Sequence, residues 1–252
     1  MNNLMNYKYL LKTENETIQK SENEIQIWYE NYEVFMDSLF QFIYYVGETN
    51  DPNSDEGMFF AFAHLHFLKI PYTLRATALL LERGYYAESA QLVRNLFEVI
   101  VQLRYFQLNK NLLNDYVLKI KKITNRTMIG HFNDNLYTTV YSALSTISHS
   151  EIGSTIFRTY YKSSSEGRTI MGCQFNSRFY HFIMNILEAI IFGLLNFIPS
   201  FFDQYLQNVP ESIEDQRIKC LNEISIILNA EPKSLEFLDN IALLIGLNQE
   251  QQ

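Results

Sequence analysis

Apolar side chains recur along most of this chain at intervals of three and four residues. That spacing places them on one face of an α-helix, whereas the side chains of a half-buried strand alternate every second residue. The pattern therefore predicts a mostly helical protein. The predicted helices cover residues 22–47, 58–83, 85–107, 112–127, 141–149, 178–206, 211–228 and 233–246.

Turn-forming residues interrupt this pattern at a few places. Residues 47–57 (GETNDPNSDEG) concentrate Gly, Pro, Asn and Asp, which favour turns. Pro71 is expected to kink its helix or divide it in two, because proline removes one backbone donor and clashes with the preceding turn. Residues 154–175 hold two β-branched and aromatic runs around SSSEG, a pattern typical of a hairpin or of an irregular loop.

These features predict an all-α helical bundle in a single domain, residues 1–252. Its core is expected at about residues 58–207, with helical extensions at residues 1–47 and 211–247. At most one short β-hairpin is expected, within residues 154–175. A hydrophobic content of 47%, with only nine glycines and five prolines, suits a chain that buries a sizeable core.

One narrow polar stripe crosses an otherwise apolar helix. It consists of Gln91, Arg94, Glu98 and Gln102, whose spacings of three and four residues keep them on one helical face. Burying a charged group is costly unless that group is paired and hydrogen-bonded, so Arg94 and Glu98 must meet each other, another polar helix, a partner chain or a wet cleft.

A later segment offers a matching polar face. Tyr141, Ser145 and His149 follow one another at four-residue steps, with Leu136, Val140, Leu144 and Ile147 as the apolar positions around them. Two interpretations fit the combined set of Arg94, Glu98, Tyr141, Ser145 and His149, with Arg75 as a further member. The set is either a functional site, in which an arginine binds a phosphate or carboxylate, or a buried polar network that fixes two helices in register.

These motifs resemble a known family. The order is an apolar helix from Arg75 to Gly84, an R-x-L-x-E motif at residues 94–98 and a Y-x-x-L-S-x-x-x-H motif at residues 141–149. It is similar to a large group of helical bacterial proteins described only as a domain of unknown function. We associate that group with the HEPN (higher eukaryotes and prokaryotes nucleotide-binding) superfamily of defence and toxin ribonucleases. The resemblance covers roughly residues 60–200.

The resemblance also implies a catalytic pair. Active HEPN ribonucleases use an arginine followed four to six residues later by a histidine, at a cleft to which both copies of a dimer contribute. Arg126 and His131 have this spacing. A histidine could move the proton of a ribose 2′-hydroxyl while an arginine holds the phosphate. The chain departs from the family pattern at Thr127, where Asn, Asp or His is usual, and Gly130 suggests a helix end.

Charge and composition limit the remaining functions. A net charge of −8 argues against a protein that coats nucleic acid, because such binding needs a basic surface. A local basic run remains, which fits either a small RNA-binding site or the solvated face of a helix. It comprises Lys119, Lys121, Lys122 and Arg126. We count Lys121 and Lys122 among the candidate substrate-binding residues.

No cofactor or metal ion is expected from the sequence. Cys173 and Cys220 lie far apart and in no metal-binding pattern, which also suits a reducing cytoplasm. His64 and His66 are two residues apart, on different faces of a helix, and are expected to be structural. The first 17 residues have no signal-peptide pattern, so export is not expected. Residues 182–198 are apolar but contain Glu188, and they are expected to form a core helix rather than a membrane span.

Together these features favour a cytoplasmic defence or toxin-type protein that acts on or binds RNA or a nucleotide. It would be either a metal-independent ribonuclease or a protein that only binds. The competing hypothesis is a non-catalytic interaction module. An aromatic content of 15% and the apolar helix at residues 182–198 favour a homodimer in either case, because they imply more apolar surface than a monomer easily hides. Another defence component is the alternative partner.

Overall fold

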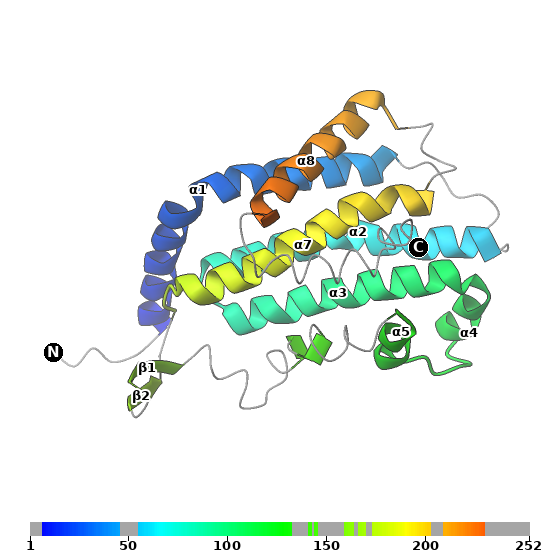
Figure 1. The fold of residues 1–252 in the computed structure, drawn as a ribbon. Helices are drawn as coiled ribbons and strands as arrows, with labels where there is room; N and C mark the ends of the chain where they lie inside the picture. Colours follow the sequence, from blue (N-terminus) through cyan, green and yellow to red (C-terminus); the bar gives the residue numbers. More distant parts are fainter. Residues whose placement is uncertain are drawn as a thin grey trace.

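The protein is an all-α helical bundle, as the sequence predicts, and the described part of the chain also holds one short hairpin (Figure 1). The computed structural model describes residues 7–45, 55–132, 141–142, 144–145, 159–163, 166–169, 173–202 and 209–229. The predicted helix at residues 233–246 and the second half of the predicted helix at residues 141–149 lie outside these residues.

Within the described residues, five long helices form the body of the bundle, and short elements lie between them. The long helices are α1 (Tyr7–Tyr45), α2 (Asp55–Glu82), α3 (Tyr86–Leu108), α7 (Ser177–Phe202) and α8 (Glu211–Asn229). After α3 come the 3-10 helix η1 (Lys110–Leu112), α4 (Leu113–Val117) and α5 (Asn125–Phe132). The hairpin pairs β1 (Thr159–Ser163) with β2 (Glu166–Thr169) in antiparallel register. The expected hairpin within residues 154–175 is thus confirmed.

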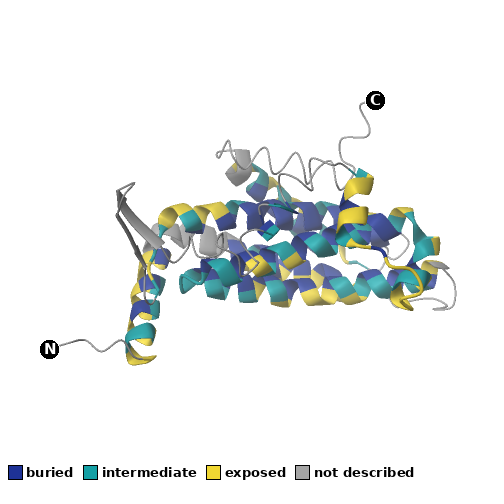
Figure 2. Ribbon diagram, turned by 90° about the horizontal axis from the view of Figure 1, so that it is seen from below, coloured by how far each residue is buried: buried dark blue, intermediate teal, exposed yellow. Residues whose placement is uncertain are grey.

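The long helices lie in layers around one apolar core (Figures 1 and 2). α2 and α3 form an antiparallel pair, α7 contacts both of them, and α8 covers α1 and α7 on the other side. α5 contacts α3 near one end of the bundle. This arrangement leaves the polar stripe of α3 on the side that faces α5 and the helical segment around Tyr141.

α7 is the core helix that the sequence predicts. Among the described residues it alone is long and apolar enough to cross a membrane, judged by length and composition. However, 72% of its most apolar window is buried inside the bundle, as in the central helix of a globular protein. Its apolar surface is therefore largely buried within the chain. We expected this helix to leave apolar surface exposed for a dimer contact, and α7 does not provide that surface.

α1 begins about fifteen residues earlier than the sequence pattern predicts. Its first turns bury small polar side chains at four-residue steps, namely Thr13, Thr17 and Ser21. Each hydroxyl bonds to a backbone carbonyl three or four residues earlier in the helix. Because this buried face carries no large apolar side chain, hydrophobic periodicity could not reveal it.

The joint between α2 and α3 lies at Gly84, where the sequence predicts it. Gly84 adopts a φ of +80°, which side chains disfavour, and an added Cβ would lie 3.2 Å from the Thr17 methyl group. α2 passes through Pro71 as one helix, so Pro71 does not divide it.

The single helix predicted at residues 112–127 is wrong. The chain leaves the helix at Lys119, whose φ is +56°. The amide of Ile120 donates to the Asp115 carbonyl, and the amide of Lys119 donates to the Tyr116 carbonyl. These two bonds make a Schellman helix end, in which glycine is the usual left-handed residue. Lysine takes that position here, so the sequence carries no sign of the break.

Candidate functional site

Arg94 and Glu98 form an ion pair on the polar face of α3. The Arg94 Nε atom donates to the Glu98 Oε1 atom at 2.9 Å. Their side chains are 17% and 18% exposed, so the pair lies at the edge of the core rather than inside it or free in solvent. The four-residue spacing within one helix makes this contact, as the sequence predicts.

Tyr141 joins this pair from a distant part of the chain. Its hydroxyl accepts a hydrogen bond from Arg94 Nη2 at 2.8 Å and donates one to Glu98 Oε1 at 3.0 Å. The Arg94 guanidinium also lies 4.9 Å from the centre of the Tyr141 ring, within range of a cation–π contact. We refer to Arg94, Glu98 and Tyr141 as the polar cluster. Tyr141 thus brings one residue of the second polar face onto the first.

Burial and the Glu98 carboxylate shape the ionisation of nearby tyrosines. The pKa of Tyr141 is raised, first by burial and then by the negative charge of Glu98. The pKa of Tyr116 is raised by the same two causes. Both phenols are therefore neutral donors at physiological pH, and Tyr116 lies close enough to Glu98 to sense its charge.

The polar face continues along α3 to Gln102 and reaches two further elements. The Gln102 side chain donates to Asn125 Oδ1, at the start of α5, at 3.4 Å. It also hydrogen-bonds to His66 of α2. His66 donates from Nδ1 to the Phe62 carbonyl at 2.8 Å, and burial is the main cause that lowers its pKa. The ring is thus neutral near pH 7, and its Nε2 atom is the one that does not bond to the backbone.

His66 is a residue whose position the sequence did not reveal. We expected His64 and His66 to be structural because their spacing suits no metal site. The bond from His66 to the Phe62 carbonyl fits that expectation, but its contact with Gln102 places it at the edge of the polar face of α3. Only the packing of α2 on α3 creates this contact.

Arg126 and His131 both lie on α5, and both are exposed. Five residues of helix rotate one side chain from the other by roughly 140°, so the two do not share a face. The His131 ring packs edge-on against Tyr105 of α3, with ring centres 5.4 Å apart. Gly130 lies in the last turn of α5, in line with the helix end that it suggested.

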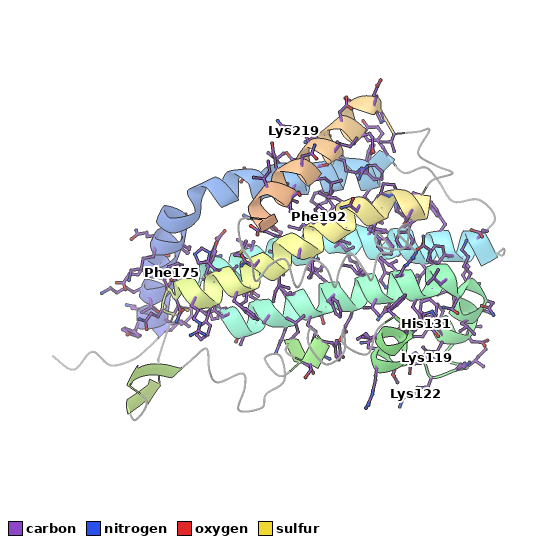
Figure 3. The ribbon with its side chains drawn as sticks, viewed as in Figure 1. Lys119, Lys122, His131, Phe175, Phe192 and Lys219 are labelled. Carbon is purple, nitrogen blue, oxygen red and sulfur yellow. The ribbon has the colours of Figure 1, made fainter. Side chains whose placement is uncertain are left out.

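The other predicted site residues are not gathered in the polar cluster. Arg75 is exposed on α2, where its charge acts on Tyr32 of α1. Ser145 is half-buried one turn after Tyr141. Lys121 and Lys122 are exposed on the turn before α5. Lys119, Lys122 and His131 share one end of the molecule, opposite to Phe175 (Figure 3). His149 lies outside the described residues.

The arrangement can hold an anion but offers no metal site in the part of the chain that the structure describes. There, no group of three or more His, Cys, Asp or Glu side chains has a metal-binding arrangement. The chemistry available is a positioned guanidinium, a carboxylate, two neutral phenols and a neutral imidazole. Such groups suit hydrogen bonding to a phosphate and the transfer of a proton.

Comparison with known proteins supports part of the family resemblance that the sequence suggests. Residues 60–131 match the model of a family of unknown function, DUF5677. The matched segment runs from α2 through α3 to α5, so it contains Arg94, Glu98, Arg126 and His131 and ends before Tyr141. No curated protein and no solved structure matches the chain.

Proposed function

We propose that this chain is a HEPN-like bacterial protein of defence or toxin type that binds RNA or a nucleotide through a phosphate at the polar cluster. The observation that carries the proposal is the geometry of Arg94. Glu98 and Tyr141 hold its guanidinium at the edge of the core, and α5, with Arg126, lies beside the same helix.

A held guanidinium suits phosphate binding for two physical reasons. Its planar donors match the oxygens of a phosphate, and fixing the side chain in advance removes much of the entropy cost of binding. The partial exposure of Arg94 and Glu98 keeps the pair within reach of a ligand, whereas a sealed ion pair would serve stability alone. Glu98 then acts as the residue that positions Arg94.

A binding assay on the full chain tests this proposal. The probes are a fluorescent single-stranded RNA of mixed sequence and ATP, and the variants are Arg94→Gln, Glu98→Ala and His149→Ala. We expect Arg94→Gln to weaken binding at least tenfold, because it removes a charged hydrogen-bond donor to phosphate. The unfolding free energy of Arg94→Gln should stay within about 1 kcal/mol of the parent, as for a group at a partly solvated site.

The matched control is Arg178→Gln, which removes an exposed arginine from α7. It should leave binding unchanged. The proposal fails if neither probe binds, or if both arginine variants weaken binding equally. Destabilisation of roughly 1 to 3 kcal/mol by Arg94→Gln, Glu98→Ala and His149→Ala, without any loss of binding, would instead assign these residues to a structural network.

Ribonuclease activity is the catalytic form of the same proposal, with Arg126 and His131 as the reacting pair. Since the two side chains do not share a face of α5, catalysis would require a second copy to complete the site. RNA cleavage in the presence of a chelator should then disappear in His131→Asn while RNA binding persists. If the parent chain binds RNA but does not cleave it, the binding function stands alone.

A second candidate function is supported by a separate observation. Five large apolar side chains are exposed on the outer faces of α1 and α2 and form what we term the aromatic ridge: Phe40, Tyr44, Leu65, Leu68 and Tyr72. The Phe40 and Tyr72 rings contact each other edge to face, so the two helices present one surface. Patches of this kind favour protein contacts. Asp37 on α1 and Lys69 on α2 flank it with opposite charges, which suits contact with a second copy.

Sedimentation at micromolar concentration tests this interaction function. Tyr72→Glu should convert a dimer to a monomer, because it places a charge at the centre of the aromatic ridge. The control is Ile226→Glu on α8, which alters a similarly exposed apolar side chain far along the sequence. A parent chain that sediments as a monomer would exclude the homodimer.

A further inference from the structure

The end of α4 and the turn that follows it combine exposed aliphatic and basic side chains. Val117, Leu118 and Ile120 are 52%, 60% and 69% exposed. Three exposed lysines lie in the same segment: Lys119 stands between Leu118 and Ile120, and Lys121 and Lys122 follow Ile120. We refer to residues 117–122 as the basic turn. Large aliphatic side chains are usually buried, so three of them in one exposed turn call for an explanation.

The aliphatic side chains of the basic turn lie mostly outside the core. A Schellman helix end is often accompanied by an apolar contact between its last residue and the final helical turn. Ile120 holds that last position, but the helical residues it would meet are Asn114 and Asp115. Ile123, just beyond, is instead buried and anchors the segment to the bundle.

The local charge of this region is opposite to that of the whole chain. Residues 110–131 contain five Lys or Arg residues and one acidic residue, Asp115, although the chain as a whole carries a charge of −8. Asp115 is half-buried and its carbonyl accepts the backbone bonds that close the turn. The exposed side of the basic turn is therefore strongly positive beside a negative body.

We propose that the basic turn docks on an anionic lipid bilayer, with Ile120 and Leu118 entering the headgroup region and Lys119, Lys121 and Lys122 contacting lipid phosphates. Aliphatic side chains gain free energy among acyl chains, while nearby lysines gain from a negative surface. The backbone bonds of the turn fix its backbone before binding, so binding has to order only the side chains.

The composition of the basic turn favours lipid over nucleic acid. Single-stranded nucleic acid is typically held by aromatic side chains on which bases stack, together with basic residues. The basic turn interleaves its lysines with Val, Leu and Ile and contains no aromatic residue. The turn also lies outside the polar cluster, so lipid docking and phosphate binding at Arg94 can succeed or fail independently.

Vesicle co-sedimentation of the full chain tests the proposal. The parent should bind vesicles of phosphatidylcholine mixed with phosphatidylglycerol and not vesicles of phosphatidylcholine alone, and added salt should weaken binding. Lys121→Gln with Lys122→Gln should weaken binding about 25-fold, since each lysine near such a surface contributes about fivefold. Ile120→Asn should weaken it about tenfold through the lost apolar contact.

The matched control is Lys8→Gln with Lys12→Gln, which removes two exposed lysines from α1 and the same amount of charge. It should bind vesicles as the parent does, and circular dichroism should show all variants folded. The proposal is overturned if vesicle binding is absent, or if the control weakens it as much as the test variants. It is also overturned if Lys121 and Lys122 support binding of single-stranded RNA while no vesicle binds.

Discussion

Arg217 of α8 donates from its Nη1 atom to the backbone carbonyl of Leu195 in α7. That carbonyl would normally accept the amide of residue 199, four positions later, but residue 199 is a proline inside the helix and has no amide hydrogen. Arg217 thus supplies the donor that Pro199 lacks. Its other nitrogens bind the Glu214 carboxylate, which holds the guanidinium in place.

This relationship predicts a stability change that depends on the residue at position 199. Arg217→Met should lower the free energy of unfolding by about 1 to 3 kcal/mol, because it leaves the buried Leu195 carbonyl without a partner. In a Pro199→Ala background the new amide can donate to Leu195, so the same change should cost less. A double-mutant cycle measured by urea unfolding gives the difference. Equal costs in the two backgrounds would show that the carbonyl contact contributes nothing.

The polar cluster predicts a graded response to mutation. Tyr141→Phe removes only the bridging hydroxyl and should cost about 1 kcal/mol of unfolding free energy. Glu98→Ala leaves a half-buried guanidinium without its carboxylate, so we expect a larger loss. The two losses should not add in the double variant, since both residues bond to Arg94 and to each other. Additive losses in chemical unfolding would mean that the three side chains act independently.

Much of this fold can be predicted from helical periodicity, because α3 and α7 bury large apolar side chains at regular intervals. The first half of α1 could not be predicted in the same way, since Thr13 and Thr17 face the core in place of apolar residues. The break at Lys119 was missed for a different reason. A left-handed lysine has no signature in sequence, whereas the left-handed Gly84 does.

The same distinction applies to the candidate site, where a contact within one helix could be predicted and contacts between helices could not. Arg94 and Glu98 were predictable as a pair, because their contact is local to one helix. The contact of Tyr141 with both required two helices to pack in one register, which the sequence suggests by matching polar faces but does not determine. The contact between His66 and Gln102 depends on how α2 packs against α3. The residue spacing within either helix does not predict it.

The positive φ of Lys119 leads us to expect that glycine at this position stabilises the protein. A non-glycine residue in the left-handed region costs roughly 1 to 2 kcal/mol, and glycine avoids this cost while adding some freedom to the unfolded chain. Lys119→Gly should therefore raise the unfolding free energy by about 0.5 to 1 kcal/mol. Lys121→Gly is the control, because it removes the same charge from a position without positive φ. Thermal melts in which the control stabilises as much as the test variant would contradict this explanation.

His66 predicts how stability depends on pH. Burial lowers its pKa below 6.5 in the folded protein, and His64 is shifted in the same direction, again mainly by burial. Between the lowered pKa and 6.5 the unfolded chain binds more protons than the folded one. The free energy of unfolding is therefore fully present above pH 6.5 and decreases as the pH falls below that value. Urea unfolding of the parent at pH 7.5 and at about pH 5.5 should show this loss.

His66→Asn should reduce that pH-dependent loss, because the asparagine amide can replace the Nδ1 donor to the Phe62 carbonyl but does not titrate. The comparison is His181→Asn, which removes an exposed histidine from α7 and should leave the difference between the two pH values as in the parent. If His66→Asn loses as much stability on acidification as the parent does, the imidazole of His66 is not a source of the acid sensitivity. The loss would then belong to His64 or to the carboxylates.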